Sequence, residues 1–277
     1  MTAFASDGNV TKTVYIYSTG RDAVKGTGAS GSTETAGQWL AIPMSAAEFP
    51  GWGGLKVIPA MQAFLIQVTG ETSMTLDYDA MVRSNTTNYT EKLHAPQRFA
   101  DEQATTLTRL SVADSQTHTD LYLFEGDQFS EAFDNGWEAQ YMEGDGRSAQ
   151  LYAMASEDKM AVLASPELEG TQVGFAPGQE TAYTFSFTGG TGTYYLNDIK
   201  AQKSALIQEG NTYSFDYENG DAANRFYISK TAIDAPAIGT GVDNTQSAIK
   251  VQKFIFQNKL YILRNGVLYD ATGKVVK

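Results

Sequence analysis

Apolar and polar residues alternate along most of this chain, in short runs that are closed by turn residues. Successive side chains of a β-strand point to opposite faces, so a period of two predicts strands with one buried face. Nine such runs lie at a spacing of roughly ten residues, the pattern of a β-sandwich or barrel. They span 105–112, 121–124, 150–155, 160–164, 172–175, 181–187, 193–196, 212–217 and 225–229. We therefore expect an all-β fold, an antiparallel and jelly-roll-like β-sandwich over 101–232, in which only 129–137 looks helix-like.

Shorter runs flank this region on both sides. Strands at 14–17, 39–42, 61–68 and 73–78 predict an N-terminal β region over 1–100. The run 61–68 is apolar on both faces, which predicts a strand covered on two sides rather than an edge strand. Polar residues and glycines over 233–250 predict a flexible linker. The last residues, 251–277, predict a small β-hairpin tail, because Asn265-Gly266 is a strong hairpin signal.

The charge balance argues against polyanionic partners. The 277 residues carry 20 basic and 32 acidic side chains, a net charge of −12, so nucleic acid would be repelled over most of the surface. Without any cysteine, the chain has no disulfide framework, thiolate zinc site or cysteine nucleophile. Since no apolar stretch reaches the ~18 residues of a membrane span, we predict no direct membrane insertion. The start of the chain lacks the pattern of a signal peptide, so we expect a truncated N-terminal region with further domains upstream.

Several residue types in the chain are candidates for chemistry. Gly26, Gly28 and Gly31 fit the spacing of a dinucleotide-binding loop, but no apolar helical period follows, so a flexible hairpin loop is favoured. His94 and His118 each stand alone in a polar stretch, which favours a structural or surface role over a Ser triad. We predict no catalytic, cofactor-binding or metal residues, and no enzyme activity.

One region is dense in acidic residues. A glycosidase needs two carboxylates ~5–10 Å apart across a cleft, but in an acidic chain such a cluster is more often a solvated loop. The region comprises Glu125, Asp127, Glu131, Asp134, Glu138, Glu143 and Asp145. A calcium ion held by Asp127 and Asp134 is a further possibility that the pattern leaves open, although no EF-hand loop is present.

Aromatic side chains near turns could stack on sugar rings, although aromatics at strand ends more often fill the core. The candidates are Trp52, Trp137, Tyr141, Tyr194 and Tyr195. They motivate an alternative function, a carbohydrate-binding or accessory module of a secreted glycan-processing enzyme.

Three segments of the predicted sandwich resemble the ending of secreted and cell-surface β-sandwich proteins from Bacteroidetes. They are Tyr194-Tyr195-Leu196-Asn197-Asp198, Asn211-Thr212-Tyr213-Ser214-Phe215 and Asn224-Arg225-Phe226. Residues 58–64, Arg109-Leu110, Phe133-Asp134 and Gln150-Leu151-Tyr152 resemble upstream strands of the same proteins. The segment 259–270 is similar to their C-terminal tails, a short version of a sorting-type export signal. The resemblance implies a surface or secreted location and the fold, without a single activity.

From these observations we expect a non-catalytic cell-surface or secreted module that serves attachment, display or structural support. Its partners would be a glycan or another surface protein, together with the upstream domains of the same polypeptide.

Overall fold

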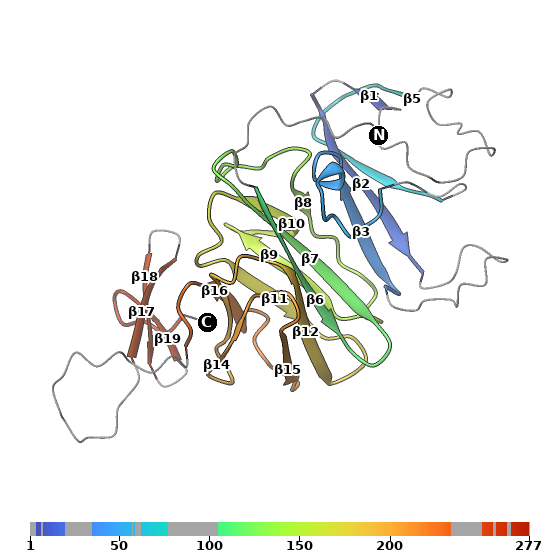
Figure 1. Cartoon of the computed structure of the whole chain (residues 1–277). Helices are drawn as coiled ribbons and strands as arrows, with labels where there is room; N and C mark the ends of the chain where they lie inside the picture. Colours follow the sequence, from blue (N-terminus) through green and yellow to red (C-terminus); the bar gives the residue numbers. More distant parts are fainter. Residues whose placement is uncertain are drawn as a thin grey trace, which may run out of the picture.

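Strands form almost all of the regular structure in the computed structural model of the chain (Figure 1). The structure describes residues 4–6, 8–19, 35–56, 58, 62–76, 105–233, 251–256, 259–264 and 267–276. The N-terminal strands are β1 (Phe4–Ser6), β2 (Val10–Ser18), β3 (Gln38–Pro43), β4 (Leu65–Val68) and β5 (Met74–Leu76), with the 3-10 helix η1 (Ala46–Glu48). The central strands are β6 (Thr106–Ala113), β7 (His118–Glu125), β8 (Ala139–Gln140), β9 (Gln150–Ala155), β10 (Asp158–Ser165), β11 (Gln172–Ala176), β12 (Ala182–Gly189), β13 (Tyr195–Asp198), β14 (Lys203–Leu206), β15 (Thr212–Asp216) and β16 (Phe226–Ser229). The tail strands are β17 (Val251–Phe256), β18 (Lys259–Arg264) and β19 (Val267–Asp270).

The central strands form one hydrogen-bonded sheet that folds over itself. Its order is β14-β13-β16-β11-β9-β10-β7-β6-β12-β15, with β8 paired to β10. The main core is shared by residues from both halves of this path, such as Phe226 and Leu196 from one half and Phe185 and Leu110 from the other. The two halves therefore face each other across a single apolar layer, and the predicted all-β sandwich is confirmed.

Strands β7 and β10 run parallel at the middle of the sheet, the exception to the predicted antiparallel pairing. Leu121 and Leu123 of β7 belong to the main core, whereas Tyr122 and Phe124 belong to a second core on the opposite face. Parallel strands are usually covered on both faces, and the continuous apolar run of β7 satisfies this requirement.

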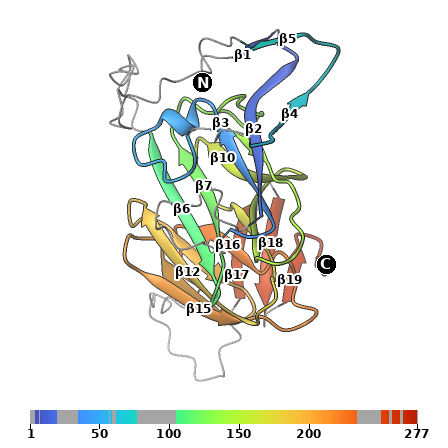
Figure 2. The same cartoon turned by 90° about the vertical axis from the view of Figure 1, so that its right-hand side faces the viewer.

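The cover over the second face comes from the N-terminal region. Strands β3, β2 and β4 form a separate sheet, and its Val14, Ile16 and Ile42 pack with η1 onto the outer face of β7 and β10. Figure 2 shows this sheet, in blue, standing above the central strands. The two parts share one apolar core and are held together by burial of that face.

The strand 61–68 was predicted to be covered on both sides, and this prediction is wrong. Of its described residues, 62–68, only 65–68 form a strand, β4, which lies at the edge of its sheet with β2 as its partner. Ile66 packs against the second core, but Leu65 and Val68 are 45% and 52% exposed. A short apolar run cannot by itself distinguish a covered strand from an edge strand, because the number of neighbouring layers is set by distant residues.

The prediction that 129–137 is helix-like is also wrong, because this segment forms turns. The amides of Trp137 and Glu138 both donate to the carbonyl of Asp134, and Gly136 has a positive φ of 98°. The side chain of Asp134 accepts a hydrogen bond from the amide of Ser130, and this local bond competes with a helix.

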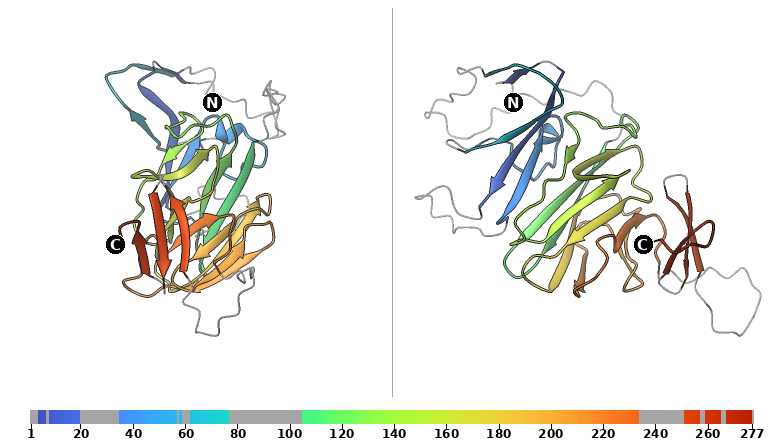
Figure 3. Two further views of the ribbon diagram at one scale, coloured as in Figure 1. Left: turned by 90° about the vertical axis from the view of Figure 1, so that its left-hand side faces the viewer. Right: turned by 180° about the vertical axis from the view of Figure 1, so that it is seen from behind.

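The tail forms a separate sheet, in the order β17-β18-β19, and a further small sheet pairs β1 with β5. Its three strands lie within the predicted range 251–277, and the predicted hairpin tail is confirmed. Asn265 and Gly266 lie outside the described residues, as does most of the linker 233–250. Figures 1 and 3 show the tail, in red, beyond β14 and β16, on the side of the sandwich away from the N-terminal sheet.

Candidate functional site

The segments that carry the resemblance to surface proteins meet in a buried ion pair. Arg225 donates from Nε to Oδ1 of Asp198 at 2.8 Å and from Nη2 to Oδ2 at 2.6 Å. Asp198 is fully buried and Arg225 is 7% exposed. The same carboxylate accepts hydrogen bonds from the hydroxyl of Tyr213 at 2.8 Å and the amide of Ala201 at 3.0 Å. Each carboxylate oxygen of Asp198 thus accepts two hydrogen bonds, one of them from Arg225. In this geometry the two buried charges are tolerated.

This network links the two ends of the folded sheet. Tyr213 lies on the terminal strand β15, whereas Asp198 lies on β13 at the other end. The guanidinium of Arg225 lies 4.9 Å from the ring centre of Phe215 and also donates to the carbonyl of Asp216. Although burial opposes the charged form, the contact with Asp198 raises the pKa of Arg225 above its ordinary value. The ion pair and its hydrogen bonds therefore hold the two ends of the folded sheet together.

A second buried carboxylate belongs to Glu138, whose main chain also contacts the N-terminal sheet. Glu138 is 3% exposed and accepts hydrogen bonds from the amides of Asp134 at 2.8 Å and Ala164 at 3.2 Å. Its carbonyl accepts a hydrogen bond from the hydroxyl of Thr13 on β2. Burial raises the pKa of Glu138, while the two amides lower it in part. A carboxylate with a raised pKa can mark a catalytic acid, but both oxygens of Glu138 are bound to backbone amides within the protein.

Asp145 forms a further contact between the N-terminal sheet and the sandwich. Its Oδ2 accepts hydrogen bonds from the hydroxyl of Tyr17 at 2.8 Å and from Nε of Arg147 at 2.9 Å. The Tyr17 bond, followed by the contacts with Arg147, lowers the pKa of Asp145. A Cβ on Gly37 would lie 1.9 Å from this carboxylate, so the close approach requires glycine at that position.

The remaining acidic candidates are also spread over separate contacts. Glu125 accepts a hydrogen bond from the hydroxyl of Tyr194, and Asp134 caps the turn at Ser130. Nowhere in the described ranges do three or more acidic or histidine side chains form a group that could hold a metal ion. The structure thus brings the predicted acidic residues together neither as a pair across a cleft nor as a calcium cage.

The aromatic candidates contribute mostly to the core. Trp52 is 5% exposed and stacks on Tyr122 with ring centres 4.1 Å apart, and Trp137 packs against Phe124 at 5.3 Å. Tyr194 is 5% exposed. The partly exposed rings are those of Trp137, of Tyr141, beside Tyr152, and of Tyr195.

Of the histidine and glycine candidates, His118 lies in the described part of the chain. His118 begins β7 and its carbonyl accepts a hydrogen bond from Gln38 of the N-terminal sheet. His94 and the segment 26–31 lie outside the described residues. No helix that is long and apolar enough to cross a membrane occurs in the ranges described above.

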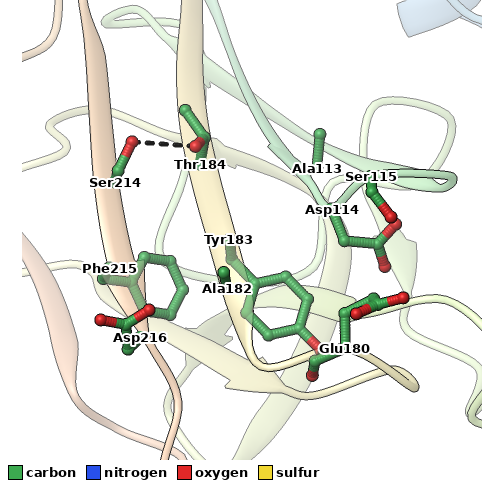
Figure 4. A pocket seen from close by; sticks show the side chains of 10 residues that line it. All are labelled: Ala113, Asp114, Ser115, Glu180, Ala182, Tyr183, Thr184, Ser214, Phe215 and Asp216. Carbon is green, nitrogen blue, oxygen red and sulfur yellow. Dashed lines mark hydrogen bonds between the residues drawn. The ribbon is translucent and has the colours of Figure 1, made fainter.

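An open pocket of about 490 Å³ lies over β12, β15 and the turn after β6. Figure 4 shows the carboxylates of Asp114 and Glu180 on one side, that of Asp216 on the other, and the ring of Tyr183 between them. Asp114 accepts hydrogen bonds within its own turn from the amides of Gln116 and Thr117. Within the described residues no ion pair engages Glu180 or Asp216. Sequence reasoning missed this pocket, because its three acidic residues are more than 30 positions apart and come together only through strand pairing.

The chain is similar to a fimbrial subunit. Over 233 residues, which cover 79% of the chain, it is 32% identical to the minor fimbrium subunit Mfa5 of Porphyromonas gingivalis. The match covers 19% of that protein, so the chain spans about a fifth of the length of the curated relative it matches. No protein-family model matches the chain, and no solved structure matches it. The similarity confirms the predicted cell-surface or extracellular location and supports the resemblance to surface proteins of Bacteroidetes.

Proposed function

We propose that the chain is a non-catalytic structural module of a fimbria-like surface assembly, which supports attachment or display through contacts with other surface proteins. The observation that carries this proposal is the similarity to a minor fimbrium subunit over 79% of the chain. The chain spans only about a fifth of that protein, so its contacts with other proteins of such an assembly are also part of what we propose.

The roles of the polar side chains support a structural function. The carboxylates of Glu125, Glu138 and Asp145 accept hydrogen bonds from, in turn, the hydroxyl of Tyr194, two backbone amides that include that of Ala164, and the hydroxyl of Tyr17. They join segments that lie far apart in the sequence, which is how polar residues stabilise a fold rather than a reaction.

We further propose the division of the chain into an N-terminal β region at 1–100, a sandwich at 101–232, a linker at 233–250 and a tail at 251–277. In this proposal the tail acts as a sorting-type export signal. Expression of the full gene product in its native bacterium, with and without 251–277, tests this role. Surface labelling should be lost on deletion, and unchanged labelling would remove the export role from the tail.

The assembly role is tested by immunogold electron microscopy with antibodies against this chain. Gold particles should follow surface fibres or lie at their ends, and deletion of the gene should shorten, thin or detach them. A complemented strain is the control. Labelling confined to the cytoplasm, or fibres of normal number and length in the deletion strain, would contradict the proposal.

The carbohydrate-binding alternative receives no support from the comparisons. Trp137, one of its two leading aromatic residues, packs against Phe49, Phe124 and Phe129 rather than forming a flat exposed platform. Binding on a glycan array that is abolished by Tyr195→Ala would revive this alternative.

A further inference from the structure

Asparagine, one of the chemically labile residues of proteins, is followed by glycine at three positions of the chain. Two of these dipeptides, Asn135-Gly136 and Asn219-Gly220, are described by the structure, and Asn265-Gly266 lies outside the described residues. In such a dipeptide the glycine amide nitrogen lies close to the side-chain carbonyl carbon of the asparagine, and glycine has no Cβ to obstruct attack. Asp134 and Glu218 precede the two described copies, so their local sequences are well matched and the fold should decide between them.

The turn at Asn135-Gly136 is held by the N-terminal region. The side-chain oxygen of Asn135 accepts a hydrogen bond from the amide of Lys12 at 2.6 Å. The carbonyl of Gly136 accepts two more, from the amides of Ser45 at 2.8 Å and Ala46 at 3.1 Å, and Gly136 is buried. The side chain of Asn135 is therefore fixed, and it must lose its hydrogen bond to Lys12 before it can turn toward the amide of Gly136.

The turn at Asn219-Gly220 is closed by a hydrogen bond from the amide of Asp221 to the carbonyl of Glu218 at 3.0 Å. Gly220 has a φ of 98°, whereas that of Asn219 is negative, which defines a type II β-turn. The amide of Gly220 takes no part in the closing bond of such a turn. Within the described residues, no hydrogen bond engages this amide or the side chain of Asn219, and both residues are exposed. A Cβ on Gly220 would meet no atom within 4 Å, so the space around the turn is open.

We propose that Asn219 is a site of spontaneous deamidation in the folded protein. The amide nitrogen of Gly220 gives up its proton to solvent and forms a bond to Cγ of Asn219, and the side-chain nitrogen takes up a proton and leaves as ammonia. The five-membered imide that results then adds one water molecule at either of its two carbonyl carbons. Opening of the bond between this nitrogen and Cγ leaves aspartate at position 219. Opening of the bond to the main-chain carbonyl carbon leaves isoaspartate, in which the main chain runs through the former side chain.

Either product changes the charged network beside the turn. Oδ2 of Asp221 accepts hydrogen bonds from the amide of Glu218 and from Nη1 of Arg225, both at 3.1 Å, and Oδ1 pairs with Nζ of Lys200 at 2.7 Å. Both products add a negative charge next to Glu218, and isoaspartate also lengthens the turn that positions Asp221. The modification therefore acts on a contact of Arg225, and the modified fraction grows with the age of the molecule. This chemistry belongs to the chain by itself, so its failure would leave the proposed assembly with other proteins untouched.

Peptide mapping by mass spectrometry of the full chain, incubated at mildly alkaline pH, tests the site. The peptide that contains Asn219 should gain the mass difference between a hydroxyl and an amino group, and it should separate into two products of equal mass. It should do so about tenfold faster than the peptide that contains Asn135, since one hydrogen bond changes the population of a free side chain by roughly this factor. The rate should rise with pH, because the attacking amide must lose its proton.

Incubation of the same chain in urea is the control for the effect of the fold. Once the chain is unfolded, the two asparagines should react at similar rates, because neither turn is then held. The variant Asn219→Gln, whose longer side chain would have to close a larger ring, should lose the modification at 219 and leave that at Asn135 unchanged. The proposal is overturned if Asn219 stays intact in the folded chain while the chain in urea is modified. It is also overturned if Asn135 reacts as fast as Asn219 in the folded chain.

Discussion

Replacing Asp198 by asparagine removes the negative charge from the buried ion pair while keeping the size of the side chain. Arg225 then loses the charge that faces its Nε and Nη2 at 2.8 and 2.6 Å. It retains a contact between Nη1 and Asp221 at 3.1 Å. The amide nitrogen of the new asparagine also faces a donor from Arg225, so at least one hydrogen bond is lost.

Removal of one partner from a buried ion pair costs about 3–5 kcal/mol, because the other charge is left buried and unpaired. The remaining contact with Asp221 places Asp198→Asn near the lower end, at about 3 kcal/mol. For a domain of this size each kcal/mol lowers the melting temperature by about 2–4 °C, so the loss should be roughly 6–12 °C.

Urea unfolding followed by tyrosine and tryptophan fluorescence measures this loss. Asp158→Asn, which changes an exposed carboxylate at the start of β10, is the matched control and should change the free energy of unfolding by less than about 0.5 kcal/mol. The double variant Asp198→Asn/Arg225→Gln should lose less than the sum of the single variants, since no unpaired charge remains. A loss below about 1 kcal/mol for Asp198→Asn would refute the view that this network closes the sandwich.

Three further predictions concern burial. Burial holds the pKa of Glu138 above the 4.5 of a free glutamate, so the stability that Glu138 contributes is present below pH 4.5 and is lost as pH rises through the raised pKa. The urea midpoint of the wild type should therefore fall relative to that of Glu138→Gln between pH 4 and pH 7. A constant difference between the two midpoints would contradict this. Gly174→Ala places a Cβ 2.0 Å from the ring of Tyr152 and should cost about 1–3 kcal/mol in urea unfolding, whereas Gly8→Ala, with open space around it, should cost little. Trp52→Ala removes a stacked, buried ring and should cost about 3–5 kcal/mol, with faster proteolysis of the N-terminal region; equal rates would show that this ring does not hold the region in place.

The strands of the sandwich could be read from the sequence because each buries one face in a locally alternating pattern. The run 150–155 corresponds to β9 residue for residue, and the other eight differ by a few positions at their ends. The run at β14 was missed, since Lys203–Leu206 holds one strongly apolar residue and lies at the end of the sheet. A strand of four residues in that position has too weak a period to be recognised.

Contacts that depend on distant pairing could not be foreseen. The parallel alignment of β7 with β10 skips β8 and β9 in sequence order, and nothing in either strand encodes its neighbour. The pocket carboxylates are a further case, as Asp114 and Asp216 become close only when β6 and β15 both pair with β12. By contrast, Asp198 and Arg225 stood out as part of a recurring motif, although the sequence did not reveal that they form an ion pair.

The double-sided burial of β7 bears on where this protein can be cut. A fragment starting at residue 101 would keep the core between the two halves of the sandwich but would lack the N-terminal sheet. Tyr122, Phe124 and Val162 would then form an apolar patch exposed to water at the middle of the largest sheet. Such a fragment should aggregate on expression even though all the strands of the sandwich are present. Shorter versions for crystallography or immunisation should therefore keep the N-terminal sheet, from residue 8 through β4, and trimming is safer at the C-terminal side, beyond Ile233.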